Sequence, residues 1–239
     1  MRIENIAVFF SILLLIPGCS STPTTPSPPA TNKPVINSFS ASPETIDLGS
    51  ASTLSWSVSN AQNVVIDQGI GTVDSTGSIA VSPNATVTYT LTASNANGAV
   101  SKSCLVTVNQ PPVINGFAAT PNVITLESSS TLSWDVSNAV TRTIDPGIGQ
   151  VSATGSTIVS PNSTTVYTLT AVNGSFTVTA TCMITVDWQN FICYKTATGT
   201  KYHRGNCQYL SQSKIQTTLG EACAQGLTPC SVCNPPSCR

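Results

Sequence analysis

The chain has 239 residues and a formal net charge of −1, with nine basic side chains, ten acidic side chains and a single histidine. That histidine lies in the last fifth of the chain, so a Ser-His-Asp triad is excluded from the long middle part. The near-neutral total also hides a division, because residues 34–187 are acidic and residues 188–239 are mildly basic.

Residues 1–19 have the pattern of an export signal. A weakly charged lead is followed by an apolar run at residues 6–16, which is too short to span a bilayer but suits the core of a signal peptide. The run ends in the sequence IPGC, which resembles a bacterial lipobox. This resemblance implies a lipoprotein whose Cys19 is lipidated and becomes the mature N-terminus. The alternative is an ordinary cleaved secretory signal with an incidental cysteine.

Residues 20–33 are mostly serine, threonine and proline, with no apolar side chain larger than alanine. Such a segment cannot form a core and favours extended, polyproline-like conformations. We therefore expect a tether that separates a membrane anchor from the first folded domain.

The middle of the chain contains one sequence twice. A segment that starts at Pro34 recurs from Pro112, at a constant offset and without a gap, and more than half of the aligned positions are identical. A period of this length predicts two complete domains, at residues 34–109 and 112–187. In residues 53–58 and 86–93, apolar side chains alternate with serine and threonine, which predicts strands with one buried face. Trp56 is the largest side chain of that buried face.

Both copies carry the blocks TLSW, GIG and SPN, followed by YTLTA. Over residues 34–187 these blocks resemble bacterial surface domains of the immunoglobulin/PKD-like type. The resemblance implies that residues 34–187 form two tandem Ig-like β-sandwiches. With the small α+β zinc module that we expect at residues 188–239, the expected fold class is mainly β. The resemblance implies little about function, because one fold serves many functions. Cys104 and Cys182 fall on the apolar face of the last strand of each copy, where we expect buried small side chains; a disulfide between the repeats is the alternative.

Residues 188–239 hold six of the nine cysteines and the only histidine. His203 and Cys207 form an H-x3-C pair, and Cys230 and Cys233 form a C-x2-C pair flanked by prolines. Two such pairs on separate turns can complete a tetrahedron around Zn²⁺. A module of this size also needs a metal or disulfides to stay folded. We therefore predict a structural zinc site with these four ligands.

The local pattern of the module predicts a hairpin from strands at 191–196 and 200–204, then a helix at 213–226 that ends at Gly226. The skeleton H-x3-C…P-C-x2-C-x-P is similar to a small metal-binding module at the ends of some secreted nuclease-like and DNA-uptake proteins, and to the zinc domain of the DNA-alkylation-repair protein Ada. In the Ada pattern all four ligands are cysteines and the first accepts the methyl group. His203 occupies that position here, so the repair activity is not carried over.

Three alternatives to zinc remain open. The first is an all-disulfide framework, since an exported protein lies in an oxidising space. The second is thiol–disulfide exchange at Cys230 and Cys233, although the prolines that follow exclude the helix that usually activates such a pair. The third is that His203 is only a surface residue. If zinc is bound, Cys193 and Cys223 could form a disulfide beside it, and Cys238 would then be left over.

The sequence thus predicts an extracytoplasmic, membrane-anchored surface lipoprotein whose stalk presents a binding module. We expect no catalysis and no small-molecule substrate. The basic charge of the module suggests an anionic polymer, including nucleic acid or a cell-envelope polysaccharide, as its partner. The alternative is a solvated basic face without a ligand. The competing interpretations are a thiol-exchange enzyme and a purely structural stalk with a disulfide-stapled cap.

Overall fold

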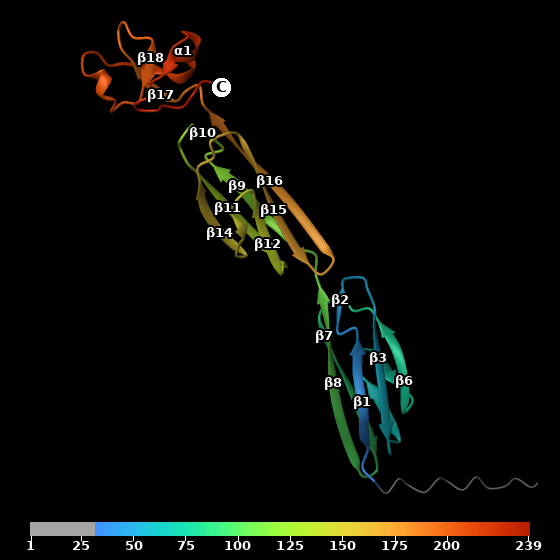
Figure 1. Ribbon diagram of the computed structural model, residues 1–239. Helices are drawn as coiled ribbons and strands as arrows, with labels where there is room; N and C mark the ends of the chain where they lie inside the picture. The colour runs from blue at the N-terminus through green and yellow to red at the C-terminus, as the bar shows by residue number, and fades with distance from the viewer. Residues whose placement is uncertain (1–31) are drawn as a thin grey trace, which may run out of the picture.

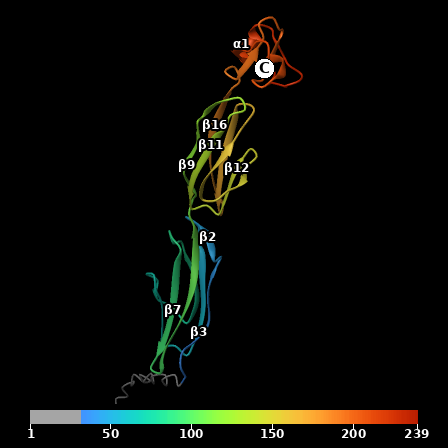
Figure 2. The ribbon, with the colours of Figure 1, turned by 90° about the vertical axis from the view of Figure 1, so that its left-hand side faces the viewer.

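A computed structural model describes residues 32–239, which form three units arranged end to end in a rod (Figure 1, Figure 2). The predicted signal, Cys19 and nearly all of the tether lie outside the described residues. Within the described part, none of the helices has the length and apolar character needed to cross a membrane. The chain is mainly β, as the sequence predicts.

The first unit is a sandwich of two sheets. One sheet has the order β1-β3-β6 and the other the order β2-β8-β7-β4-β5. The strands are β1 (Val35–Ser42), β2 (Thr45–Asp47), β3 (Ser52–Ser59), β4 (Asn63–Ile66), β5 (Gly71–Thr72), β6 (Thr76–Val81), β7 (Val87–Asn95) and β8 (Gly98–Asn109). All pairings are antiparallel except that of β2 with β8, which is parallel.

The second unit repeats this topology strand for strand, with sheets in the order β9-β11-β14 and β10-β16-β15-β12-β13. Its strands are β9 (Val113–Thr120), β10 (Val123–Thr125), β11 (Ser130–Ser137), β12 (Thr141–Asp145), β13 (Gly149–Gln150), β14 (Thr154–Val159), β15 (Thr165–Asn173) and β16 (Phe176–Asp187). Again only the short strand β10 runs parallel to its partner, β16. The sequence repeat is therefore a repeat of complete sandwiches.

Each core is built from the alternation seen in the sequence. Along β3 every second side chain is buried, and Trp56 lies between the sheets with only 7% of its surface exposed. Its indole Nε1 donates to the carbonyl of Asp74 at 2.8 Å, which satisfies the one polar atom of the ring. Gly77 lies directly against the indole, and a Cβ at that position would be 2.9 Å from the ring. Trp134 repeats these contacts in the second sandwich, with Ser152 as acceptor at 3.0 Å.

The single cysteines of the two sandwiches do not pair with each other. Cys104 on β8 and Cys182 on β16 are free thiols, half-buried against the core of their own sandwich. Burial raises the pKa of both thiols. They act as small apolar side chains, and the alternative of a disulfide between the repeats is wrong.

A carboxylate joins the two sandwiches. Asp47, at the end of β2, accepts the backbone N–H of Ser175 at 3.0 Å and the side-chain amide of Asn109 at 2.8 Å. A hydrogen bond from the Ser175 side chain, followed by those from the Asn109 amide and the Ser175 backbone, lowers the pKa of Asp47. Asn173, beside Ser175, donates in turn to the carbonyl of Gln110 in the linker, at 3.0 Å. The β15–β16 turn of the second sandwich is thus hydrogen-bonded to the end of the first sandwich.

The third unit, residues 188–239, is called the head from here on. Its sheet has the order β19-β17-β18-β20, from β17 (Ile192–Lys195), β18 (Lys201–His203), β19 (Ile215–Thr218) and β20 (Thr228–Pro229). One helix, α1 (Leu219–Ala224), and one 3-10 helix, η1 (Gln208–Leu210), complete it. The β17–β18 hairpin agrees with the sequence-based expectation.

The helix expected at residues 213–226 is shorter. Residues 215–218 instead form β19, which pairs with β17. Thr218 ends that strand and begins α1 through a capping box: its side chain accepts from the N–H of Glu221, whose carboxylate accepts from the N–H of Thr218. Gly226, with φ of +71°, follows the end of the helix as expected.

We expect Trp56→Ala to lower the free energy of unfolding of residues 34–109, produced alone, by about 3–5 kcal/mol, because it removes the largest buried side chain. Denaturant unfolding followed by circular dichroism, without metal or oxidant, measures the change. Ser55→Ala on the solvent face of the same strand is the control and should have little effect. Equal stability of the tryptophan variant and the parent would show that Trp56 is not a core residue.

Candidate metal centre

The four predicted ligands come from four places in the head. His203 is the last residue of β18, and Cys207 immediately precedes η1. Cys230 follows β20, whose parallel pairing with β18 brings it beside His203, and Cys233 lies in the next turn. The sequence analysis placed all four in turns, but His203 is in a strand and is oriented by the sheet.

The structure brings the four side chains together. One potential ligand atom from each residue lies within 4.8 Å of the other three. His203 Nδ1 is 3.2 Å from the Cys207 sulfur and 3.9 Å from the Cys233 sulfur, and the sulfurs of Cys207 and Cys230 are 4.0 Å apart. In a tetrahedral zinc site with bonds of about 2.0–2.3 Å, neighbouring ligand atoms are about 3.5–3.8 Å apart. The observed separations bracket that range.

The surroundings suit a bound cation. Cys207, Cys230 and His203 are buried, and Cys233 is partly buried. Burial, with a smaller effect of the nearby Lys201 charge, lowers the pKa of His203 and favours the neutral imidazole that a metal requires. Although burial opposes ionisation of Cys230, hydrogen bonds from the backbones of Cys233 and Val232 lower its pKa.

The pKa of Cys233 is shifted in the opposite direction from that of Cys230. Burial raises the pKa of its thiol to about 11, and its neighbours Cys207 and Cys230 add to this effect, while the backbone N–H of Arg204 opposes it. Crowded sulfurs cannot all ionise without a compensating positive charge. A divalent cation bound among them would supply that charge, so the donor set fits zinc.

The other cysteines of the head pair differently from the expectation. Cys223 on α1 forms a disulfide with Cys238, with Cα atoms 5.8 Å apart, so the suggested bond between Cys193 and Cys223 is wrong. Cys193 is a free, fully buried thiol, and burial raises its pKa to about 11. The cause is the path of the last residues, which return across the head: the hydroxyl of Tyr202 donates to the carbonyl of Pro236 at 2.8 Å. Sequence spacing contains no signal for that return.

A pocket of about 450 Å³ adjoins the cluster. His203 and Cys230 form part of its lining, and the Lys201 side chain is exposed at its edge. Within residues 32–239 the Lys201 ammonium group makes no hydrogen bond or ion pair. The remaining lining residues are three with hydroxyl groups on short side chains, a glycine, a tyrosine and a valine: Thr196, Thr200, Ser231, Gly199, Tyr209 and Val232.

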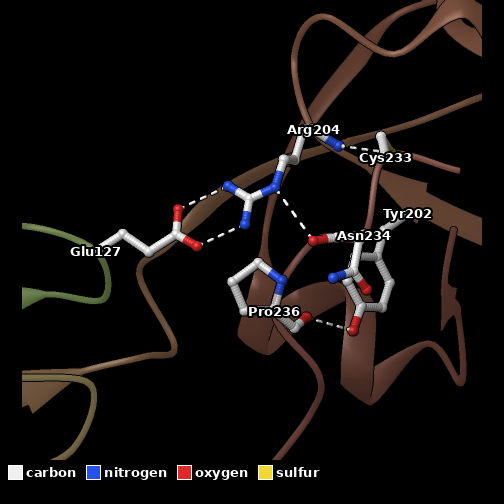
Figure 3. A network of polar contacts seen from close by, with 6 residues as sticks. All are labelled: Glu127, Tyr202, Arg204, Cys233, Asn234 and Pro236. Carbon is white, nitrogen blue, oxygen red and sulfur yellow. Dashed lines mark hydrogen bonds and ion pairs between the residues drawn. The ribbon is translucent and has the colours of Figure 1, made fainter. Parts of the chain in front are cut away.

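Arg204 connects the cluster to the second sandwich (Figure 3). Its backbone N–H donates to the Cys233 sulfur at 3.3 Å, and its Nε donates to the carbonyl of Asn234 at 3.2 Å. Its two terminal nitrogens bind both carboxylate oxygens of Glu127, at 2.6 and 2.5 Å. This bidentate pair lowers the pKa of Glu127 and raises that of Arg204. The sequence analysis identified neither residue.

Comparison with known proteins identifies the fold of the sandwiches but assigns no function. No family model matches the chain. An uncharacterized protein of Ruminiclostridium cellulolyticum is 36% identical over 143 residues, which cover 57% of this chain and 38% of that protein. The chain thus spans less than half the length of this relative.

Among solved structures, the I-band fragment I67–I69 of titin superposes with a TM-score of 0.51 and 12% identity, covering 74% of this chain and 83% of the fragment. A variant of the same three-Ig fragment, with Glu replaced by Ala, gives the same values. At this identity the likeness concerns the fold alone. It shows that the sandwiches are tandem Ig-like domains.

We expect Cys230→Ser to abolish metal binding and to unfold the head while both sandwiches stay folded, because a hydroxyl cannot replace the thiolate. Elemental analysis of protein isolated without added metal, with amide hydrogen exchange to locate unfolding, measures both effects. Cys104→Ser, which removes a thiol far from the cluster, is the control, and His203→Cys should retain the metal. A metal-free parent with every cysteine oxidised, and a head indifferent to chelator, would contradict the zinc assignment.

Proposed function

We propose that this protein is a lipid-anchored, extracytoplasmic binding protein without catalysis, in which two Ig-like sandwiches hold a zinc-stabilised head away from the membrane. The observation that carries the proposal is the convergence of His203, Cys207, Cys230 and Cys233 in the terminal unit of the rod. A closed site with four protein ligands leaves no open coordination position for a substrate. Zinc in such a site has a structural role.

Thiol–disulfide exchange is the less well supported function. Cys230 has a lowered pKa, as an attacking thiol would. However, its sulfur lies 4.0 Å from that of Cys207, and the same cluster contains His203, so the C-x2-C pair is not an isolated dithiol. The turn of Cys233 continues into Asn234 and two prolines, not into a helix. A cap held by disulfides alone would require the cluster cysteines to pair, and all three are free thiols here.

The pocket beside the zinc ligands supports an anionic polymer as the partner of the head. Lys201 presents an unpaired positive charge there, next to the hydroxyl groups of Thr200 and Ser231. The head is basic: residues 188–239 contain five basic side chains, of which Arg204 is neutralised by Glu127. Both sandwiches are acidic. Attraction to a polyanion would therefore be concentrated at the head.

Binding to dextran sulfate, with neutral dextran as the reference, tests this partner class. We expect Lys201→Gln to weaken binding several-fold and to flatten its dependence on salt, because one ionic contact is lost. Lys102→Gln, which removes the same charge from the first sandwich, is the matched control and should leave affinity unchanged. Single-stranded DNA in the same assay shows whether nucleic acid belongs to the class. Equal affinity of the two variants would contradict a binding role for the pocket.

The anchor is the second part of the proposal. The described chain begins at residue 32, at the end of the rod opposite to the head (Figure 1). An anchor at Cys19 would therefore place the head farthest from the membrane. The hydrogen bond from the Asn95 side chain to the carbonyl of Asn32, at 2.7 Å, holds the last part of the tether against the first sandwich.

We expect Cys19→Ala to release the protein from membranes or to leave an unprocessed precursor, because the apolar run before it is too short to span the bilayer. Cell fractionation and incorporation of labelled fatty acid measure the effect. Cys104→Ser, which retains Cys19, should still be labelled. Labelling and membrane association that persist in the Cys19→Ala variant would contradict the lipoprotein assignment.

A further inference from the structure

The turn that carries Glu127 occurs in both sandwiches, but with different residues. In the first, the N–H of Ser50 donates to the carbonyl of Asp47 at 2.9 Å; in the second, that of Ser128 donates to Thr125 at 3.0 Å. The third residue of each turn has a positive φ, +88° at Gly49 and +66° at Glu127. Glycine adopts this conformation without strain, whereas a glutamate disfavours it.

The difference between the copies coincides with a difference in neighbours. A side chain at Gly49 would meet no atom within 4 Å. Glu127 lies next to the head, and both of its carboxylate oxygens bind the Arg204 guanidinium (Figure 3). The turn itself does not require a glutamate, because glycine suits the same backbone conformation. The contact of Glu127 with Arg204 is the feature that accounts for a glutamate at this position.

Arg204 is also held by the ligand loops. It follows His203, its backbone N–H binds the Cys233 sulfur, and its Nε binds the carbonyl of Asn234, the residue after Cys233. The direction of the guanidinium therefore depends on the two ligand loops remaining adjacent. A metal that links His203 to Cys233 would keep them so.

We propose that Glu127 and Arg204 form a clamp that fixes the orientation of the head on the second sandwich and couples this orientation to metal occupancy of the cluster. The coupling rests on the proposed zinc site, whereas the clamp does not. By thermodynamic reciprocity, a clamp that is favoured by bound metal must itself favour metal binding.

The orientation is tested in the full-length protein by ¹⁵N relaxation, which compares the rotational correlation times of amides in the head and in the second sandwich. In the parent we expect one shared value. In Glu127→Gly, which restores the residue of the first copy, we expect a shorter value for the head, with the sandwich at least as stable as before. Asp135→Asn removes one charge from an exposed site on β11 of the same sandwich and is the matched control. A head that keeps the shared correlation time in Glu127→Gly would overturn the clamp.

The coupling is tested by zinc competition with a chromogenic chelator. We expect Glu127→Gly to weaken zinc binding about five-fold, which is the lower end of the range typical of allosteric coupling, and Asp135→Asn to leave it unchanged. Arg204→Lys keeps the backbone N–H but cannot form the bidentate hydrogen bonds of the guanidinium. Combined with Glu127→Gly, it should therefore cause little further loss of zinc affinity. Unchanged affinity, or full additivity, would overturn the coupling. If the parent binds no metal, the proposed zinc site and the coupling both fail, while the relaxation experiment still decides the clamp.

Discussion

The orientation of the three units along the rod depends on one carboxylate from each sandwich, located in the same turn of the two copies. Asp47 of the first sandwich accepts a hydrogen bond from the backbone N–H of Ser175 in the second sandwich. Glu127 of the second sandwich binds Arg204 of the head. Ion pairs at exposed positions contribute little stability in isolation. Geometry matters more at Glu127, because its two hydrogen bonds with the planar Arg204 guanidinium fix an angle as well as a distance. Hydrogen bonds at both junctions thus direct each unit relative to the next.

Between the second sandwich and the head, apolar packing adds to the polar contact of Glu127 with Arg204. A single hydrophobic cluster extends from Ile124 and Val186 of the second sandwich to Tyr202 and Leu219 of the head, and Trp188 packs against it. The head therefore shares the core of a larger neighbour, which relieves the shortage of buried surface in a module of its size. This shared core attaches the head to the second sandwich, while the proposed role of the Glu127–Arg204 pair is to set the orientation of the head on it.

The sequence predicts those features whose cause is local or repeated. Alternation along β3 and β7 indicates the buried faces, and the repeat itself indicates two equal sandwiches. The convergence of His203, Cys207, Cys230 and Cys233 was predicted because metal chemistry restricts both residue type and spacing. The start of α1 was missed because Ile215 and Thr217 are compatible with both helix and strand, and pairing with β17 decides between them. The partner of Cys223 depends on how the last residues return across the head, which no local pattern records.

The head contains a disulfide and a candidate metal centre in different parts of its chain. The disulfide between Cys223 and Cys238 ties the last residues to α1, whereas a metal bound by the cluster would tie β18 to the turn after β20. Tyr202 lies between them: it precedes His203 on β18, and its hydroxyl binds the carbonyl of Pro236. The fully buried ring therefore transmits the position of the C-terminal segment to the strand that orients His203. Reduction of the disulfide would release that segment from α1 but would remove none of the four donor atoms of the cluster.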